Sequence, residues 1–219
     1  MLGMIKYIVD KFSIFDSNTL SEYRHLYEFI EKNSLYVSQV TLFTYIKTRA
    51  GTQWPKLFEN EDYLTSLRIA RWHIFIACVS DLSIFIAAQF HINETSDTKI
   101  CRKIAIDLFS TIVRNIEQND IDKSIFETAL IVNERRCATV NFIHAFKGDY
   151  AFQTSAQALL DWAPVVDSFK KSDAAIVRNS IHLRWINVRQ KLLKKLQNDS
   201  IIREINLKFY EIEDMHPIK

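Results

Sequence analysis

Two stretches of the chain have the spacing that places glutamate and histidine on one face of a helix. Glu22 and His25 form one E-x-x-H run, and Glu213 and His216 form another. Di-iron helical bundles combine two such runs with two further glutamates on facing helices. Here the first run falls in a short predicted helix and the second abuts Pro217, while H-E-x-x-H is absent. We therefore expect no metal site, and no motif indicates a cofactor.

Asp81 is the carboxylate of greatest chemical interest, because it lies inside the most apolar segment of the chain. Ser80 and Ser83 are its neighbours, and His73 lies two turns away on the same helical face. A buried carboxylate requires a hydrogen-bonding or charged partner, or else a raised pKa. Two interpretations follow. Asp81 is a structural aspartate paired with a group on a neighbouring helix, or it is a catalytic acid or base in a small hydrolase whose site includes His73.

Glycine is scarce, and its scarcity excludes several classes of enzyme. Only Gly3, Gly51 and Gly148 occur among the 219 residues. Phosphate-binding loops, dinucleotide-binding turns and the nucleophile elbow of α/β-hydrolases need glycines at fixed spacing, because their backbones approach a ligand closely or adopt positive φ. Three isolated glycines form none of these motifs. The sequence therefore has no catalytic signature.

A second set of candidate functional residues is basic. Lys and Arg dominate the charge between residues 170 and 195, where Asp173 is the single acidic residue. At about 100° per helical residue, one apolar stripe forms. It consists of Val177, Ile181, Trp185, Val188, Leu192 and Leu196. The basic residues along its edges, which are candidate partner-binding residues, are Arg178, Arg184, Arg189, Lys191, Lys194 and Lys195.

This basic edge has two interpretations. Long Arg and Lys side chains can cover the margin of an apolar stripe while their charged ends stay in water. Alternatively, the edge is an electropositive surface that contacts an acidic protein, a nucleic acid or an anionic lipid. The net charge of the chain is only +2 and no nucleic-acid-binding motif is evident, so such a preference must come from charge distribution. Acidic residues that could neutralise the edge within the chain are Glu204, Glu211, Glu213 and Asp214.

The segment from Gly51 to Phe58 is a predicted loop in which Trp54 directly precedes Pro55. Large aromatic side chains in a loop either fold back onto the core or anchor a binding partner, since Trp is favoured in binding hot spots. The same alternatives apply to Trp162. We include Trp54 among the candidate partner-binding residues.

Helices have to position all of these side chains. Capping signals and the placement of Gly, Pro, Asn and Asp divide the chain into helices. Their predicted ranges are 20–32, 33–50, 62–91, 97–117, 124–146, 156–162, a helix from Pro164, 173–197 and 201–211. No strand pattern, repeat or interdomain linker is evident. We predict an all-α, single-domain bundle of about six to eight helices around the central apolar helix 62–91, with 1–17 as an arm and 212–219 as a tail.

Composition indicates the environment of the protein. The chain is 48% hydrophobic and 25% charged, which is typical of a folded globule, and its three widely spaced cysteines fit reduced thiols. Lys6, Asp10 and Lys11 interrupt the apolar N-terminal residues, unlike the layout of a signal peptide. The apolar segment Ile74–Phe90 carries Asp81 at its centre, which favours a buried core helix over a membrane span. We expect a cytoplasmic protein.

The segments LYVSQVTLFTYIKTRAGT (Leu35–Thr52) and IARWHIFIACVSDL (Ile69–Leu82), with Trp162–Pro164 and Asn179–Ile181, are distributed over most of the chain. They resemble a small family of all-helical alphaproteobacterial proteins that are often labelled esterases. The resemblance implies an all-helical protein. The label implies a serine nucleophile, a histidine and an oxyanion hole.

The leading hypothesis is a non-enzymatic helical binding or adaptor protein that contacts an acidic partner through the basic helix and the Trp54 loop. The alternative is an esterase-like hydrolase with a polar site near Asp81 and His73. A third hypothesis is a carrier of an apolar ligand, which requires a cavity lined by aromatic rings. The rings in question are Phe75, Phe85 and Phe109.

Overall fold

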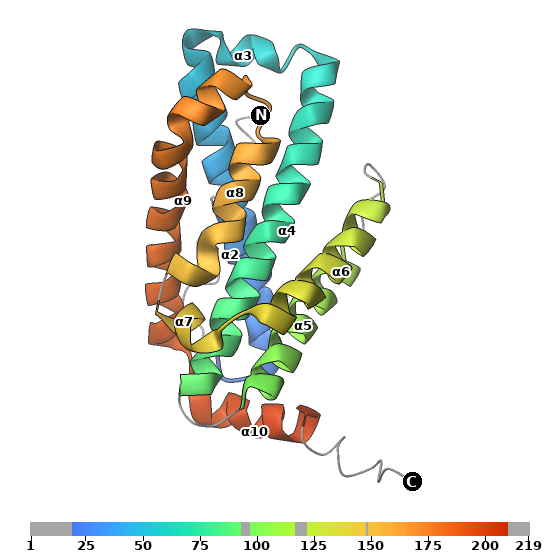
Figure 1. Cartoon of the computed structure of the whole chain (residues 1–219), viewed down its shortest axis with the longest axis vertical. Helices are drawn as coiled ribbons and strands as arrows, with labels where there is room; N and C mark the ends of the chain where they lie inside the picture. The colour runs from blue at the N-terminus through green and yellow to red at the C-terminus, as the bar shows by residue number, and fades with distance from the viewer. Residues whose placement is uncertain (1–18, 93–96, 117–121, 148, 210–219) are drawn as a thin grey trace.

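Helix α4 (Glu61–Ile92) forms the axis of the molecule, and the other helices are arranged around it (Figure 1). The computed structural model describes residues 19–92, 97–116, 122–147 and 149–209. The other helices are α2 (Tyr23–Ala50), α3 (Trp54–Leu57), α5 (Thr98–Arg114), α6 (Ser124–Thr139), α7 (Phe142–Phe146), α8 (Gln153–Trp162), α9 (Asp167–Lys195) and α10 (Asn198–Phe209). The described residues are 88% helical and include no strand, so the predicted all-α, single-domain bundle is confirmed. The predicted arm and tail, 1–17 and 212–219, lie outside the described residues.

The composition of α4 explains its central position. Every side chain from Ile74 to Phe90 is buried, and a helix that is apolar on all sides must be covered on all sides. Helices α2, α5, α7 and α8 all pack directly against it. The helix is long and apolar enough to cross a membrane, but 94% of its most apolar window is buried inside the bundle. The structure therefore places α4 as a core helix.

Helix α2 is unbroken, which corrects the predicted boundary at Asn33 or Ser34. The Asn33 amide donates to the Phe29 carbonyl of the same helix at 2.7 Å instead of capping a new helix. One buried face runs without interruption from Leu26 to Ile46. Packing of this continuous face keeps the chain helical through Asn33, although asparagine often lies at the end of a helix.

The helix predicted over 124–146 is two helices, α6 and α7, separated after Thr139. Arg102 of α5 donates to two carbonyl groups in the last turn of α6, at 2.9 and 3.1 Å, and so satisfies groups that helix ends leave unpaired. Asn141 then caps α7 by accepting a hydrogen bond from the His144 N–H at 3.0 Å. The break therefore combines a local capping residue with a contact from another helix.

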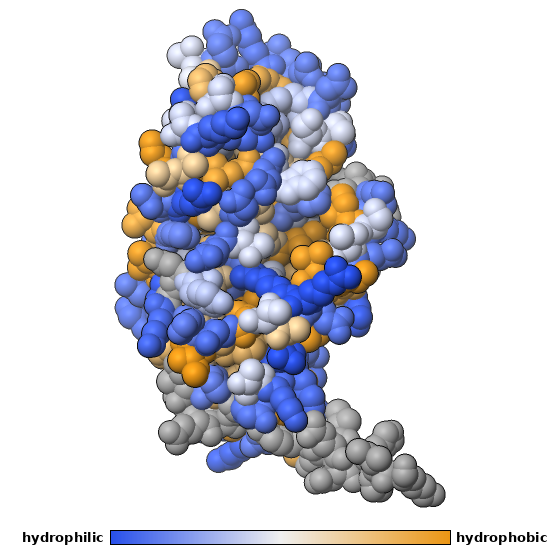
Figure 2. All heavy atoms as spheres, in the orientation of Figure 1, coloured by the Kyte–Doolittle hydropathy of each residue, from blue (hydrophilic) through white to orange (hydrophobic). Residues whose placement is uncertain are grey.

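Helix α9 is continuous, so the helices predicted from Pro164 and over 173–197 are one element that begins at Asp167. An acidic residue in the first turn favours a helix start there because of the helix dipole. Helix α10 crosses the lower end of the bundle in Figure 1. Most of the face seen in Figure 2 is hydrophilic, but apolar surface recurs along the edge where α9 runs.

The start of α2 and the end of α9 are joined through the backbone. The Leu20 N–H donates to the Lys195 carbonyl at 2.8 Å, and the Gln197 N–H donates to the Leu20 carbonyl at 2.9 Å. The Tyr23 N–H, in the first turn of α2, donates to the Glu204 carboxylate of α10 at 3.0 Å. An unpaired N–H of α2 is thus satisfied by a residue near the other end of the described chain.

Candidate functional site

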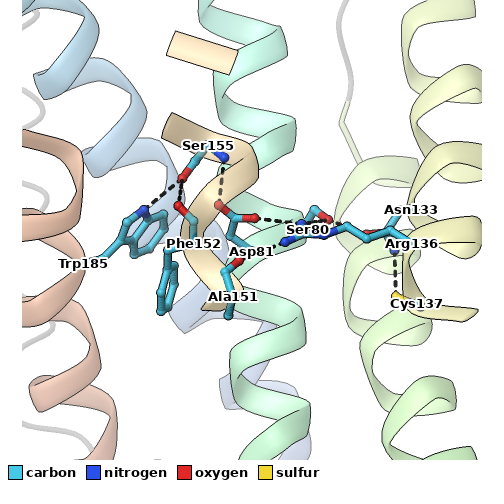
Figure 3. A network of polar contacts seen from close by, with 9 residues as sticks. All are labelled: Ser80, Asp81, Asn133, Arg136, Cys137, Ala151, Phe152, Ser155 and Trp185. Carbon is cyan, nitrogen blue, oxygen red and sulfur yellow. Dashed lines mark hydrogen bonds and ion pairs between the residues drawn. The ribbon is translucent and has the colours of Figure 1, made fainter. Parts of the chain in front are cut away.

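Asp81 lies in a buried polar network that connects several helices (Figure 3). Its side chain is 0% exposed. One carboxylate oxygen pairs with Arg136 of α6 at 2.7 Å, and the other accepts a hydrogen bond from the Ser155 N–H of α8 at 2.8 Å. Ser155 is the third residue of α8, so Asp81 supplies both an acceptor and a negative charge to the start of that helix. This geometry is that of a paired structural aspartate.

Arg136 and Ser155 extend the network in opposite directions (Figure 3). Arg136 also donates to the Ser80 hydroxyl at 2.7 Å and to the Ala151 carbonyl at 2.9 Å. The Ser155 hydroxyl accepts a hydrogen bond from the Trp185 indole N–H of α9 at 3.0 Å. The network therefore links α4, α6, α8 and α9.

The surroundings of Asp81 suit a structural role. Burial raises the pKa of its carboxyl group above the ordinary value, while Arg136 and the Ser155 N–H act in the opposite direction. Burial also raises the pKa of the neighbouring Cys78 thiol well above its ordinary value, which keeps this cysteine protonated. A general acid, general base or nucleophile has to reach its substrate. Asp81 and Cys78 are both fully buried, so neither reaches one in this structure.

His73 lies outside this network. Its ring stacks on Trp162 of α8, with ring centroids 3.4 Å apart and an interplanar angle of 4°. Burial lowers the pKa of His73 and favours the neutral ring. Eight helical residues separate it from Asp81, a rise of about 12 Å. The structure therefore does not bring the two hydrolase candidates together as an acid–base pair.

The histidine and carboxylate patterns do not form a metal site in the part of the chain that the structure describes. No three His, Cys, Asp or Glu side chains are placed there to hold an ion. In the first E-x-x-H run, the Glu22 N–H donates to His25 Nδ1 at 3.3 Å, which is a contact at the start of α2. The second run, Glu213 to His216, lies outside the described residues.

Asp173 of α9 and Glu204, one of the predicted neutralising residues, are engaged elsewhere, while the other predicted ones, Glu211, Glu213 and Asp214, lie outside the described residues. Asp173, buried at the contact between α9 and α2, forms an ion pair with Arg49 and accepts a hydrogen bond from the Tyr45 hydroxyl at 3.1 Å. Glu204 accepts the N–H at the start of α2. Neither carboxylate therefore offsets the basic side chains in the C-terminal two thirds of α9.

The inward face of α9 packs as the sequence predicts. Its buried apolar side chains are Val177, Ile181, Trp185, Val188 and Leu192. Trp185 also stacks on Phe152, with ring centroids 4.6 Å apart, so this face is anchored by an aromatic contact as well as by the hydrogen bond to Ser155. Leu196, the sixth predicted member, follows the helix and is half-buried.

Helix α9 has a second apolar face, which the sequence analysis missed. Ile176 and Leu183 are 71% and 64% exposed. The five exposed residues of this outer row are Phe169, Ile176, Leu183, Ile186 and Leu193. Their spacing of 7, 7, 3 and 7 residues is the signal that could have identified the row.

The basic candidates on α9 differ in exposure. Arg178 and Lys194 are exposed, and Arg184, Arg189, Lys191 and Lys195 are half-buried. Arg178 donates to the side chain of Gln157 on α8 at 3.2 Å, and Arg189 lies over the Phe85 ring, 5.4 Å from its centroid. The predicted basic edge therefore combines packed and solvent-facing cations. Lys194 is the exposed cation directly beside the outer row.

Trp54 folds back onto the bundle. Its ring makes edge-to-face contacts with Phe43 and Phe58, at centroid distances of 5.6 and 5.8 Å, and Lys47 lies 5.5 Å from its centroid. The side chain is half-buried. Of the two predicted roles, these contacts favour closure of the connection between α2 and α4.

A cleft of about 430 Å³ lies between α5, α6 and α10. Phe109 lines it, but Phe85 packs on Phe152 and Phe75 packs on Trp72. The three rings considered for an apolar-ligand cavity therefore do not surround a common space.

Asp107, one of the two acidic residues that line this cleft, already has partners. It accepts hydrogen bonds from the hydroxyls of Tyr23 and Tyr27 at 3.0 and 2.6 Å, and it pairs with Lys208 at 2.7 Å. Burial, followed by the nearby Asp107 charge, raises the pKa of Tyr23 well above its ordinary value. This cluster ties α2, α5 and α10 together.

Comparison of the chain with known protein families, curated proteins and solved structures finds no match. The resemblance to helical proteins labelled esterases stays a prediction. The geometry of the described residues assembles no acid–base pair from Asp81 and His73, and it presents one long apolar face to solvent. The outer face of α9 is therefore the candidate functional site of this protein.

Proposed function

We propose that this protein is a non-enzymatic helical binding protein whose outer α9 face contacts an acidic partner. The observation that carries the proposal is the outer row, five large apolar side chains exposed along one helix. Isolated apolar residues are normal on a protein surface, whereas a row of several large exposed apolar side chains along one helix favours an interaction site. The core does not require this row, because a separate face of α9 packs inward.

The charge beside the row favours an acidic partner. Residues 174–195 contain six Arg and Lys residues and no Asp or Glu, and two of the six, Arg189 and Lys194, flank the outer row. The nearest acidic residue of the helix, Asp173, is paired with Arg49. A one-sided charge next to an apolar surface attracts partners of opposite sign and repels those of the same sign.

Trp54 is left out of the proposed surface. Its contacts with Phe43 and Phe58 provide a structural reason for an aromatic residue at that position. The proposal therefore depends on α9 alone.

Retention of the full chain on acidic probes tests the proposal. The probes are vesicles containing phosphatidylserine, duplex DNA and an acidic helical peptide, each at about 50 mM and about 300 mM salt. We expect at least one probe to bind the protein, more weakly at the higher salt, and Leu183→Gln with Ile186→Gln to lower its affinity at least tenfold.

Ile131→Gln is the matched control, because Ile131 is an exposed apolar residue on α6 rather than α9. It should bind each probe as the wild type does. Absence of binding to all three probes, or equal loss in the control, would contradict a binding role for α9.

A further inference from the structure

The outer row has the periodicity of a coiled-coil seam. Phe169, Ile176 and Leu183 follow one another at seven-residue intervals, and Ile186 and Leu193 form a second seven-residue interval offset by three. In a heptad labelled a to g, the first three occupy a and the last two occupy d. The average interval of 3.5 residues brings such side chains to one narrow seam.

The fold leaves this seam accessible. The buried apolar residues of α9 occupy positions b, c and f of the same heptad, on the opposite side of the helix, and buried Asp173 occupies an e position. Docking of α9 onto the bundle therefore leaves the apolar a and d residues exposed, although Arg49 of α2 lies over the Phe169 ring, 4.7 Å from its centroid. From Phe169 to Leu193 the seam is about 36 Å long at 1.5 Å per residue.

Uncharged polar residues interrupt the row of apolar side chains along the seam. Ser172 and Asn179 occupy d positions and Gln190 occupies an a position. A polar residue at such a position fixes register in coiled coils at some cost in stability. A helix that lies in a membrane interface instead presents a broad apolar face. The narrow, interrupted seam fits a single helix better than a lipid surface.

The flanking charges select the partner. Arg189 occupies a g position and Lys194 an e position, where charges decide which helices pair. In a parallel pair with a second copy of α9, each Arg189 would face a Lys194 of the other copy, and like charges there are unfavourable. Acidic residues at e and g of another helix would complement them.

We infer that the outer face of α9 binds an amphipathic helix of about four heptads with apolar residues at a and d and acidic residues at e and g. This inference rests on the proposed function and specifies the partner of the same surface. The side chains that make the seam are Phe169, Ile176, Leu183, Ile186 and Leu193.

Two synthetic peptides of about 28 residues test the inference. Both carry Leu at a and d, and they differ only in having Glu or Lys at e and g. Fluorescence anisotropy with the full chain measures their binding at low and high salt. We expect the Glu peptide to bind at least tenfold more tightly than the Lys peptide, with a preference that decreases as salt rises.

Variants locate the binding and its charge dependence. Ile176→Gln and Leu183→Gln should each lower the affinity for the Glu peptide at least tenfold. Lys194→Glu should lower the affinity for the Glu peptide and raise the affinity for the Lys peptide. Arg178→Glu is the matched control for charge, since Arg178 is an exposed cation that points to Gln157 on α8. Ile131→Gln is the control for the loss of an exposed apolar residue. Circular dichroism checks that each variant keeps its helix content.

Three results would overturn the inference. One is equal binding of the two peptides, and another is self-association of the chain that Leu183→Gln abolishes, measured by sedimentation. The third is binding to vesicles or DNA without binding to the Glu peptide, which would leave the proposed function standing with a different acidic partner. No binding to any acidic probe would remove both proposals.

Discussion

Asp81 shows why a buried carboxylate is difficult to replace even by its closest isostere. One of its oxygens forms an ion pair with the Arg136 guanidinium, and the other accepts a hydrogen bond from the Ser155 N–H. Asparagine has one acceptor oxygen and one donor NH₂ group. Either Arg136 or Ser155 would then face another donor inside the protein.

We predict that Asp81→Asn lowers the free energy of unfolding by about 1–3 kcal/mol, the cost of one buried donor without an acceptor. Urea unfolding followed by circular dichroism measures the change. Asp62→Asn is the control, since Asp62 is an exposed carboxylate on the same helix, and it should change stability by less than about 1 kcal/mol. Equal effects of the two substitutions would contradict the assigned role of Asp81.

His73 makes stability depend on pH. Burial lowers its pKa in the folded protein, so the unfolded chain binds the proton more readily. Stability then rises with pH, and it is lost as the pH falls below the unfolded-state value of about 6.5. His73→Phe keeps an aromatic ring against Trp162 but cannot titrate there. We predict a smaller loss of stability between pH 7.5 and pH 5.5 in this variant, measured by urea unfolding; identical pH profiles would rule out the contribution of His73.

At the residue scale, the sequence predicted that Asp81 needs a partner but not which one. Its position inside an apolar helix carries the first inference, because an isolated buried charge is unstable. Arg136 and Ser155 lie on other helices, far along the chain, and their proximity depends on how α6 and α8 pack against α4. No local spacing rule contains that information.

At the scale of elements, two adjacent leucines of α9 lie in opposite environments, one buried in the core and the other exposed to solvent. Leu192 is 0% exposed on the inward face, whereas Leu193 is 54% exposed on the outer row. We predict that Leu192→Ala lowers the free energy of unfolding by about 2–5 kcal/mol, as a buried truncation does. Leu193→Ala should change it by less than about 0.5 kcal/mol. Chemical denaturation compares them, and a large loss in Leu193→Ala would mean that the outer row belongs to the core.

Helix boundaries were the part of the fold that sequence reasoning predicted least well. Asn33 and Asn141 are the same residue type, yet α2 continues through the first and α7 begins after the second. Asn33 bonds to a carbonyl of its own helix, while the break before Asn141 is supported by Arg102 of α5. Capping preference identifies candidate boundaries, and contacts between helices decide which are used. The apolar composition of α4, by contrast, was sufficient to predict its central position.

At the scale of the whole molecule, the helices share one apolar core. The buried cluster takes side chains from both ends of the described chain, from Leu20 to Phe209, and α4 lies at its centre. We predict a single cooperative unfolding transition in which helical circular dichroism and tryptophan fluorescence coincide. Trp72 and Trp185 are both buried, so their fluorescence reports on that core. Two separate transitions would show that part of the bundle folds independently.

The hydrogen bond from Tyr23 to Glu204 has a consequence for protein synthesis. The two residues are 181 positions apart, so α2 obtains this acceptor only when nearly all the described chain has been translated. At about 5–20 residues per second, that interval is about 10–35 s. During this time the Tyr23 N–H at the start of α2 lacks its native acceptor.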